Sequence, residues 1–185
     1  MSARIPPVDP NMASAEVLEL LERARLVAGD APNLHAAMAV APAALRGHVA
    51  FRAALAGGRL SPVLAEQIAL LVSEENGSRY CVATTARACA RSGVPPPELR
   101  ANQRGRSNDA RVAAALRFAA AVLDSRGRVL DGELTRVHEA GFDDEEIEEI
   151  VAHVALTCFA NFFAQVACPE LDVPRVPLTT DRDEV

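Results

Sequence analysis

The sequence contains no lysine and no tryptophan, and Tyr80 is its single tyrosine. All 19 residues of the lysine and arginine class are therefore arginines. Without lysine, the chain can form neither a lysine Schiff base nor the lysine-dependent phosphate site of a P-loop. The net charge of −6 offers no electrostatic attraction to nucleic acid or anionic lipid, so we expect neither as a partner.

Targeting and membrane signals are missing as well. Residues 1–10 contain three prolines and no apolar run, so we expect neither a signal peptide nor a membrane anchor there. No stretch is expected to be long enough to span a bilayer. We therefore expect a cytoplasmic protein that does not bind a membrane. In that compartment the four cysteines are expected as free thiols: Cys81, Cys89, Cys158 and Cys168.

Alternating apolar and polar runs, which would predict strands, are also absent. Apolar spacing, capping residues and glycine stops predict helices over 14–27, 34–55 with an interruption near Pro42, 61–75, 78–93, 97–102, 109–123, 131–140 and 143–168. We predict an all-α fold, a single bundle of about seven helices. Residues 1–12 are predicted to form an extended arm, 13–168 the domain, and 169–185 a tail that is loose at its end.

The segment from Glu66 to Gly93 carries the most chemical information. Cys81 lies in the first turn of a predicted helix, where unpaired amide groups and the helix dipole stabilise a thiolate. This position predicts a lowered pKa for Cys81. Glu66 lies on the apolar face of the preceding helix, where a lone carboxylate is costly, and it could serve Cys81 as a base or proton relay.

Each of these residues also has a structural interpretation. Ser78 is most simply the N-cap of its helix, and Cys81 a small buried apolar residue. Glu66 could form a structural hydrogen bond to the neighbouring turn. The other three cysteines are interpreted as core or surface residues without a chemical role.

Polar residues on other predicted helices are further candidates. His153, Thr157, Asn161 and Gln165 recur every four residues, which is typical of a helix face against a polar pocket, a subunit contact or a hydrogen-bonded helix seam. His48 lies among apolar residues, as a core histidine or a pocket acid/base. The four histidines show no metal-ligand spacing, so we expect no metal site, and no motif indicates a cofactor.

The same segment resembles the alkylhydroperoxidase D-like / carboxymuconolactone decarboxylase superfamily. That family has a glutamate, eleven residues, and then Cys-x-x-Cys-x-x-x-His, often around an Asn-Gly-Cys-x-Tyr-Cys core. Five residues match this pattern: Glu66, Asn76, Gly77, Tyr80 and Cys81. The likeness extends over roughly residues 30–170, through 48–51, 57–62, 140–147 and 159–163. Asn161 lies where the family often has an asparagine near its cavity.

Two departures from the pattern bear on the activity. The first cysteine of the motif is replaced by Ser78 and the histidine by Thr85, which leaves one motif cysteine. In the family the two cysteines cycle between dithiol and disulfide, and that cycle cannot run here. Cys89 cannot replace the missing thiol, because it lies two turns from Cys81, about 12 Å along the helix axis.

The resemblance implies a small-molecule substrate and a homo-oligomer, commonly a trimer or hexamer, with the site between packed helices. It leaves three functions open. The first is a peroxidase-like thiol oxidoreductase in which Cys81 acts with an external thiol as reductant. The second is a cofactor-free lyase, isomerase or hydrolase on a small organic acid, with Glu66 and His48 or His153 as acid and base. The third is a non-catalytic oligomer. Ser78, Tyr80, Thr85 and Asn161 are further expected pocket residues.

Overall fold

The computed structural model describes residues 3–28 and 32–181, and these residues form nine helices and no strand. The predicted all-α class is confirmed, with more helices than the expected seven because the 34–55 region divides and the short helix after Pro95 is complete. The helices are α1 (Ala15–Ala28), α2 (Pro32–Met38), α3 (Pro42–Leu55), α4 (Pro62–Glu75), α5 (Arg79–Arg91), α6 (Pro96–Gln103), α7 (Ala110–Ser125), α8 (Asp131–Glu139) and α9 (Asp144–Ala167).

Local capping explains where several helices begin. Ser61 precedes α4, and its hydroxyl accepts a hydrogen bond from the Leu64 amide at 3.2 Å, while Pro62 occupies the first helical position. Asp143 and Glu146 form a reciprocal capping box at the start of α9. These signals need only a few neighbouring residues, so the predicted starts of both helices are confirmed.

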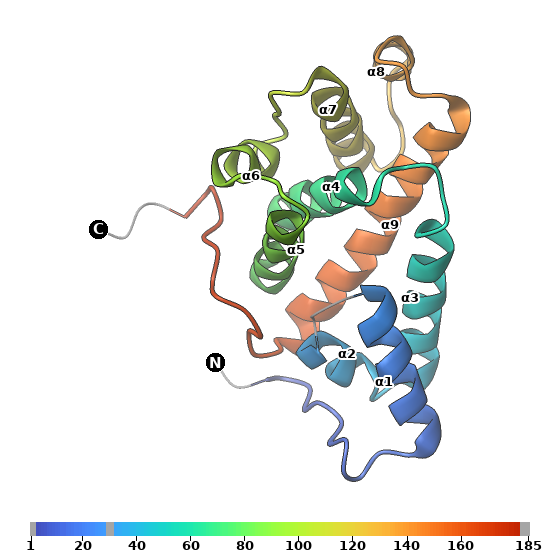
Figure 1. Cartoon of the computed structure of the whole chain (residues 1–185), viewed down its shortest axis with the longest axis vertical. Coiled ribbons are helices and arrows are strands. Elements are labelled where there is room, and N and C mark those ends of the chain that lie inside the picture. The colour runs from blue at the N-terminus through green and yellow to red at the C-terminus, as the bar shows by residue number, and fades with distance from the viewer. Residues whose placement is uncertain (1–2, 29–31, 182–185) are drawn as a thin grey trace.

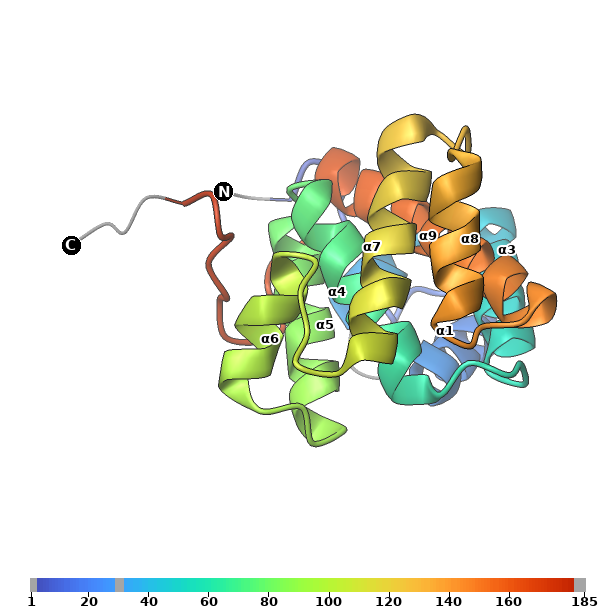
Figure 2. The ribbon, with the colours of Figure 1, turned by 90° about the horizontal axis from the view of Figure 1, so that it is seen from above.

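The long helix α9 runs through the middle of the molecule and packs against α3, α4 and α7 (Figure 1). Helices α1–α3 lie on one side of it and α4–α6 on the other. Helices α7 and α8 lie side by side at one end, as the view from above also shows (Figure 2). This arrangement encloses space between α3, α4, α5 and α9, where the candidate site lies.

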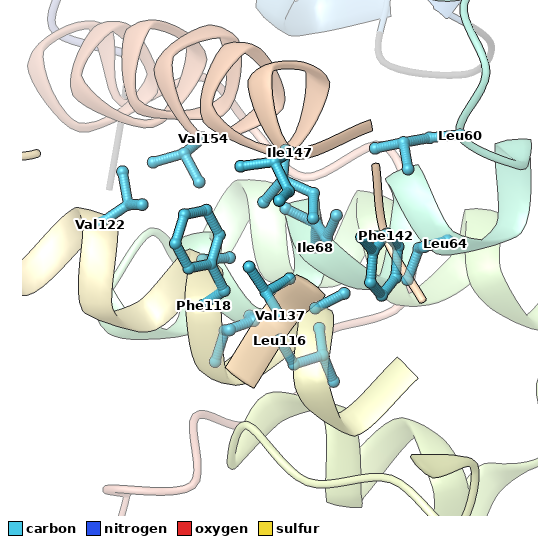
Figure 3. Close-up of a cluster of buried hydrophobic side chains, with 14 of the residues drawn as sticks. Leu60, Leu64, Ile68, Leu116, Phe118, Val122, Val137, Phe142, Ile147 and Val154 are labelled. Atoms are coloured by element: carbon cyan, nitrogen blue, oxygen red, sulfur yellow. The ribbon is translucent and has the colours of Figure 1, made fainter. Parts of the chain in front are cut away.

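The largest apolar cluster joins α4, α7, α8 and α9 (Figure 3). Ile68, Leu116 and Ile150 are fully buried at its centre, and each such side chain contributes roughly 1.5–3 kcal/mol through burial. A second cluster links α1–α3 to the start of α5 and the end of α9. The two clusters hold α4 and α9 firmly, and those helices carry several of the site residues.

Both terminal segments pack against the bundle. In the N-terminal arm the Arg4 amide donates to the Ala167 carbonyl at 2.8 Å, and the Val8 amide donates to the Ala36 carbonyl at 3.0 Å. In the tail, Val173 and Leu178 are buried. Residues 169–181 are therefore anchored, while the predicted loose end of the tail lies outside the described residues.

Helix α9 requires one correction to the sequence prediction. Its 24 residues are long and apolar enough to cross a membrane by length and composition, contrary to the expectation that no stretch is. In the fold it is the central helix of the bundle, and its apolar residues serve the two clusters described above. A buried core helix needs the same composition as a membrane span, because neither environment supplies water to polar side chains.

Candidate active site

A cavity of about 250 Å³ lies between α3, α4, α5 and α9, with the ends of α1 and α2 at its edge. Of the sequence-predicted site residues, six line it: His48, Glu66, Cys81, Thr85, His153 and Asn161. Packing thus brings together residues from four helices, as a site between packed helices requires.

Cys81 faces this cavity from the first turn of α5 and is only 4% exposed. Burial raises the pKa of its thiol, and the neighbouring Ser78 hydroxyl and Asn161 amide lower it by less. The predicted lowering of the Cys81 pKa is therefore wrong. The helix start does favour the thiolate, but removal of water from a nearly enclosed sulfur outweighs it.

Ser78 occupies the N-cap position of α5, but its side chain accepts no hydrogen bond from the helix. Its hydroxyl is buried and makes no well-directed hydrogen bond within the described part of the chain, but it lies close enough to the thiol to lower the pKa of Cys81. The predicted N-cap position of Ser78 is confirmed, but the side-chain hydrogen bond expected of a capping serine is not formed. The residue lies next to the Cys81 thiol and does not itself line the cavity.

Tyr80, expected in the pocket, lies outside the cavity lining. Its hydroxyl accepts a hydrogen bond from the Leu34 amide at 3.1 Å and donates to the Asp172 carboxylate. Burial and the adjacent carboxylate raise the pKa of Tyr80. Its hydroxyl therefore joins α5 to α2 and to the C-terminal tail.

A chain of amide hydrogen bonds holds Asn161 beside the thiol. The Asn76 amide donates to Asn161 Oδ1 at 2.9 Å, and Asn161 Nδ2 donates to Ser73 Oγ at 3.0 Å. Asn161 is fully buried, so these two bonds satisfy its oxygen and one of its N–H groups. The predicted polar line on α9 thus faces the cavity through His153, Thr157 and Asn161, whereas Gln165 is exposed.

Glu66 and Thr85 lie on facing helices at the cavity wall. Glu66 is only partly buried, and its Oε2 accepts a hydrogen bond from the Ser92 hydroxyl at 2.8 Å. Glu66 is therefore partly enclosed, as its predicted place on the apolar face of the helix suggests, and it is not cut off from solvent. The Thr85 hydroxyl donates to the Cys81 carbonyl at 2.6 Å, and this bond occupies its proton.

Three histidines reach the cavity from α2, α3 and α9: His35, His48 and His153. Burial lowers the pKa of His35 to about 3 and that of His48 to about 4, with Arg52 adding to both effects. Burial and Arg52 also lower the pKa of His153. The imidazoles are thus uncharged near neutral pH, and the lowered pKa values make them weaker bases than a free imidazole.

His48 satisfies both of its predicted interpretations, since it is buried and also lines the cavity. Its ring stacks on Phe159 with centroids 5.8 Å apart, and its Nδ1 finds no hydrogen-bond partner among the described residues. An unpartnered ring nitrogen at a cavity wall is suited to a ligand or a proton in transit.

Sequence reasoning missed Arg52 and His35. Arg52 follows His48 by one helical turn, so its presence on the same face of α3 was readable from the spacing. His35 had no such signal, because only the packing of α2 against α3 brings its ring within 5.8 Å of His48. Among the residues described, no cluster of His, Cys, Asp or Glu is arranged to hold a metal ion.

The fold and site define a class of protein: an all-α bundle whose internal cavity is lined by one thiol, one carboxylate and several imidazoles. Residues 42–125, from the start of α3 through α7, match the Carboxymuconolactone decarboxylase family. None of the curated proteins matches the sequence.

Solved structures share the fold over nearly the whole chain. An alkylhydroperoxidase AhpD core, an uncharacterized peroxidase-related protein from Ralstonia eutropha JMP134, aligns with a TM-score of 0.82 at 22% identity, over 92% of each chain. The debrominase Bmp8 aligns with a TM-score of 0.78 at 19% identity, over 93% of this chain and 94% of its own. A cysteine-to-alanine variant of Bmp8 in complex with 2,3,4-tribromopyrrole aligns with a TM-score of 0.76 at 18% identity, over 93% of each chain. The predicted resemblance to the alkylhydroperoxidase D-like / carboxymuconolactone decarboxylase superfamily is confirmed.

Proposed function

We propose that the protein is a peroxidase-like thiol oxidoreductase whose reacting group is Cys81, acting on a small hydroperoxide with an external thiol as reductant. One observation carries the proposal: of the four free cysteines, only Cys81 lines the cavity. The cavity between the helices admits a small substrate to the thiol. The surrounding helices keep large thiols and bulk water away from it.

The reaction needs no second protein cysteine. The Cys81 sulfur attacks one oxygen of the hydroperoxide, the O–O bond breaks, and the alcohol leaves with the proton that the thiol gave up. Cys81 is oxidised to a sulfenic acid as the peroxide is reduced. One external thiol then forms a mixed disulfide and releases water, and a second restores the Cys81 thiol and leaves as external disulfide.

Deprotonation of Cys81 is the demanding step, because burial raises the pKa of the thiol. A base must therefore take the proton during the reaction. The uncharged His48 and His153 rings and the Glu66 carboxylate line the same cavity and are the groups available for that role.

The neighbours in fold support this class without defining the substrate. One is peroxidase-related by description, and another is a debrominase whose variant holds a small bromopyrrole. A compact cavity that presents a thiol to a small electrophilic molecule is compatible with both chemistries.

The second candidate is a cofactor-free lyase, isomerase or hydrolase that acts on a small organic acid. The observation favouring it is the gathering of Glu66 and uncharged imidazoles around the cavity, which could run acid/base chemistry without the thiol. The third is a non-catalytic family member, in which Cys81 and Glu66 serve only packing.

Two variants compared side by side separate these functions. In the peroxidase-like enzyme, Cys81→Ala abolishes thiol-dependent consumption of cumene hydroperoxide, and Glu66→Gln slows it. In the acid/base enzyme, Glu66→Gln abolishes turnover of the substrate and Cys81→Ala has little effect. Cys89→Ala is the matched control, because Cys89 lies on the same helix but outside the cavity lining. A folded wild type that consumes no hydroperoxide contradicts the proposal.

We also propose a cytoplasmic homo-oligomer, a trimer or hexamer. In support, the outer face of α9 exposes Phe162 and Val166, which are 56% and 58% accessible in the single chain. Large apolar side chains that gather on one helix face are typical of a subunit contact. Light scattering coupled to size exclusion should give three or six times the chain mass of 19.6 kDa, and Phe162→Glu should reduce it.

A further inference from the structure

Arg52 is one of two arginines that line the cavity, with Arg91, and the proposed chemistry leaves it without a role. It extends from α3, one turn after His48, and is half-buried. Its Nε donates to the Val27 carbonyl at 3.3 Å, and this is its one hydrogen bond in the part of the chain that the structure describes. A guanidinium has five N–H donors, so four remain for another partner.

No anion within the described residues pairs with Arg52. Glu66 is the one carboxylate that lines the cavity, and it influences Arg52 electrostatically. It forms no ion pair with Arg52, and one of its oxygens is engaged by Ser92. The three imidazoles are uncharged near neutral pH and cannot compensate the guanidinium charge.

A partly desolvated cation without an ion-pair partner is unfavourable, and binding of an anion would relieve that cost. A guanidinium matches a carboxylate especially well, because two parallel N–H groups reach both oxygens. The cavity has room for a small organic molecule only. Such a molecule would contact Arg52 with its anionic end and lie beside Cys81, since both residues line the same space.

We infer that Arg52 is a specificity-determining residue that binds the carboxylate of a small organic substrate and directs its reactive end to Cys81. The preferred substrate class is therefore a small carboxylate-bearing molecule, which binds more tightly than a neutral hydroperoxide that can also reach Cys81. Only the reaction at Cys81 rests on the proposed function. Anion binding by Arg52 stands or falls separately, so the experiment measures recognition without any turnover.

The opposing interpretation is that Arg52 only links α3 to α1 through the Val27 carbonyl. Iodoacetate and iodoacetamide distinguish the two interpretations of Arg52. Both reagents alkylate the same sulfur, and they differ only in that the first carries a carboxylate and the second an amide. The rate of each reagent at Cys81 is followed by mass spectrometry, and the iodoacetate-to-iodoacetamide ratio is taken. Since the ionisation of Cys81 affects both rates alike, the ratio reports recognition of the carboxylate.

We expect the ratio at Cys81 to exceed the ratio in the urea-unfolded protein and to fall about tenfold in Arg52→Gln, as loss of a charge-assisted hydrogen bond predicts. Arg52→Lys should retain part of the preference, because it keeps the charge but loses the planar pair of donors. Arg46→Gln is the matched control: Arg46 lies on the same helix, is exposed, pairs with Glu16, and should leave the ratio unchanged.

If the iodoacetate-to-iodoacetamide ratio at Cys81 is the same in the wild type and in a folded Arg52→Gln variant, the inference is overturned. A difference in melting temperature between the two proteins does not change that conclusion. Calorimetric binding of benzoate and benzamide to the wild type provides an independent measurement. Preference for benzoate that disappears in Arg52→Gln or Arg52→Lys supports the inference, and equal or absent binding of the two compounds contradicts it. Loss of peroxidase activity alone would alter neither result.

Discussion

At the scale of single residues, Cys81 shows how two physical effects on one group compete. The start of α5 favours a thiolate, whereas enclosure by α4, α5 and α9 disfavours it. With 4% of the residue exposed, desolvation is the larger effect, and burial raises the pKa of the thiol. Reactivity at neutral pH therefore depends on a base in the cavity rather than on a resident thiolate.

The first prediction follows from the direction of this shift. Because the thiol is protonated below its raised pKa, the alkylation rate of Cys81 by iodoacetamide should increase about tenfold per pH unit from pH 7 to 9 without a plateau. In the urea-unfolded protein the rate should level off near the ordinary thiol value of about 8.5. Mass spectrometry at several pH values measures the alkylation rate in the folded and in the unfolded protein. A rate in the folded protein that levels off below pH 8 would contradict the raised pKa of Cys81.

The second prediction concerns the two positions at which the motif differs from the family. Ser78 lies next to the Cys81 thiol, and Thr85 lines the cavity one helical turn after Cys81. Ser78→Cys combined with Thr85→His should return a disulfide partner and a proton relay, and so raise dithiol-dependent reduction of cumene hydroperoxide at least about tenfold. Ser78→Cys alone serves as the control for the disulfide. No gain in a folded double variant would show that other cavity residues limit the dithiol cycle.

At the scale of elements, the C-terminal tail acts as a strap across α4 and α5. Glu74, a buried carboxylate of α4, accepts hydrogen bonds from the Thr179 amide at 2.6 Å and from the Thr179 hydroxyl at 2.8 Å. Asp181 forms two bonds with Arg79, at 2.6 and 2.7 Å. The strap thereby fixes the start of α5, the turn that carries Cys81.

The third prediction tests this strap. Glu74→Gln should weaken the contact with Thr179. In the wild type Gln103 donates a hydrogen bond to Glu74 at 2.8 Å, and in the variant the new amide N–H groups would face that donor. The expected loss of stability is roughly 1–3 kcal/mol. Trypsin cleavage after Arg175 should accelerate because the tail opens more often. Glu75→Gln, an exposed neighbour, should change neither property, and equal cleavage rates in both variants would exclude the strap.

At the scale of the whole molecule, the buried histidines of the cavity make the free energy of unfolding depend on pH. Burial lowers the pKa of His48 to about 4, below its unfolded value of about 6.5. Below pH 6.5 the unfolded chain therefore binds a proton that the folded chain does not. The stability contributed by His48 is fully present above pH 6.5 and is lost as the pH falls toward 4.

The fourth prediction gives this coupling a magnitude. Between pH 7 and pH 5 the free energy of unfolding should fall by about 2 kcal/mol through His48 alone. His48→Asn should flatten the profile by about that amount, whereas His138→Gln, outside the cavity, should leave the slope as it is. Urea unfolding at pH 7, 6 and 5 provides the measurement, and parallel profiles for the wild type and His48→Asn would contradict the assignment.

The sequence by itself determined the helices and much of the site. Helix starts such as Ser61 and Asp143 depend on hydrogen bonds within a few residues, so their pattern is readable without a fold. The spacing from Glu66 to Cys81 spans two helices joined by a tight turn. Local geometry alone therefore predicted that Glu66 could approach Cys81, and in the structure both residues line one cavity.

Only the tertiary structure decided the electrostatics of that cavity. The direction of the Cys81 pKa shift depends on how much water the packed helices exclude, and the sequence holds no measure of that exclusion. Tyr80 bonds Asp172 in the tail, and His35 meets His48 only where α2 packs on α3. Arg52 became a feature of the site for the same reason: its helix spacing was visible, but its lack of an ion-pair partner within the described chain is a property of the folded arrangement.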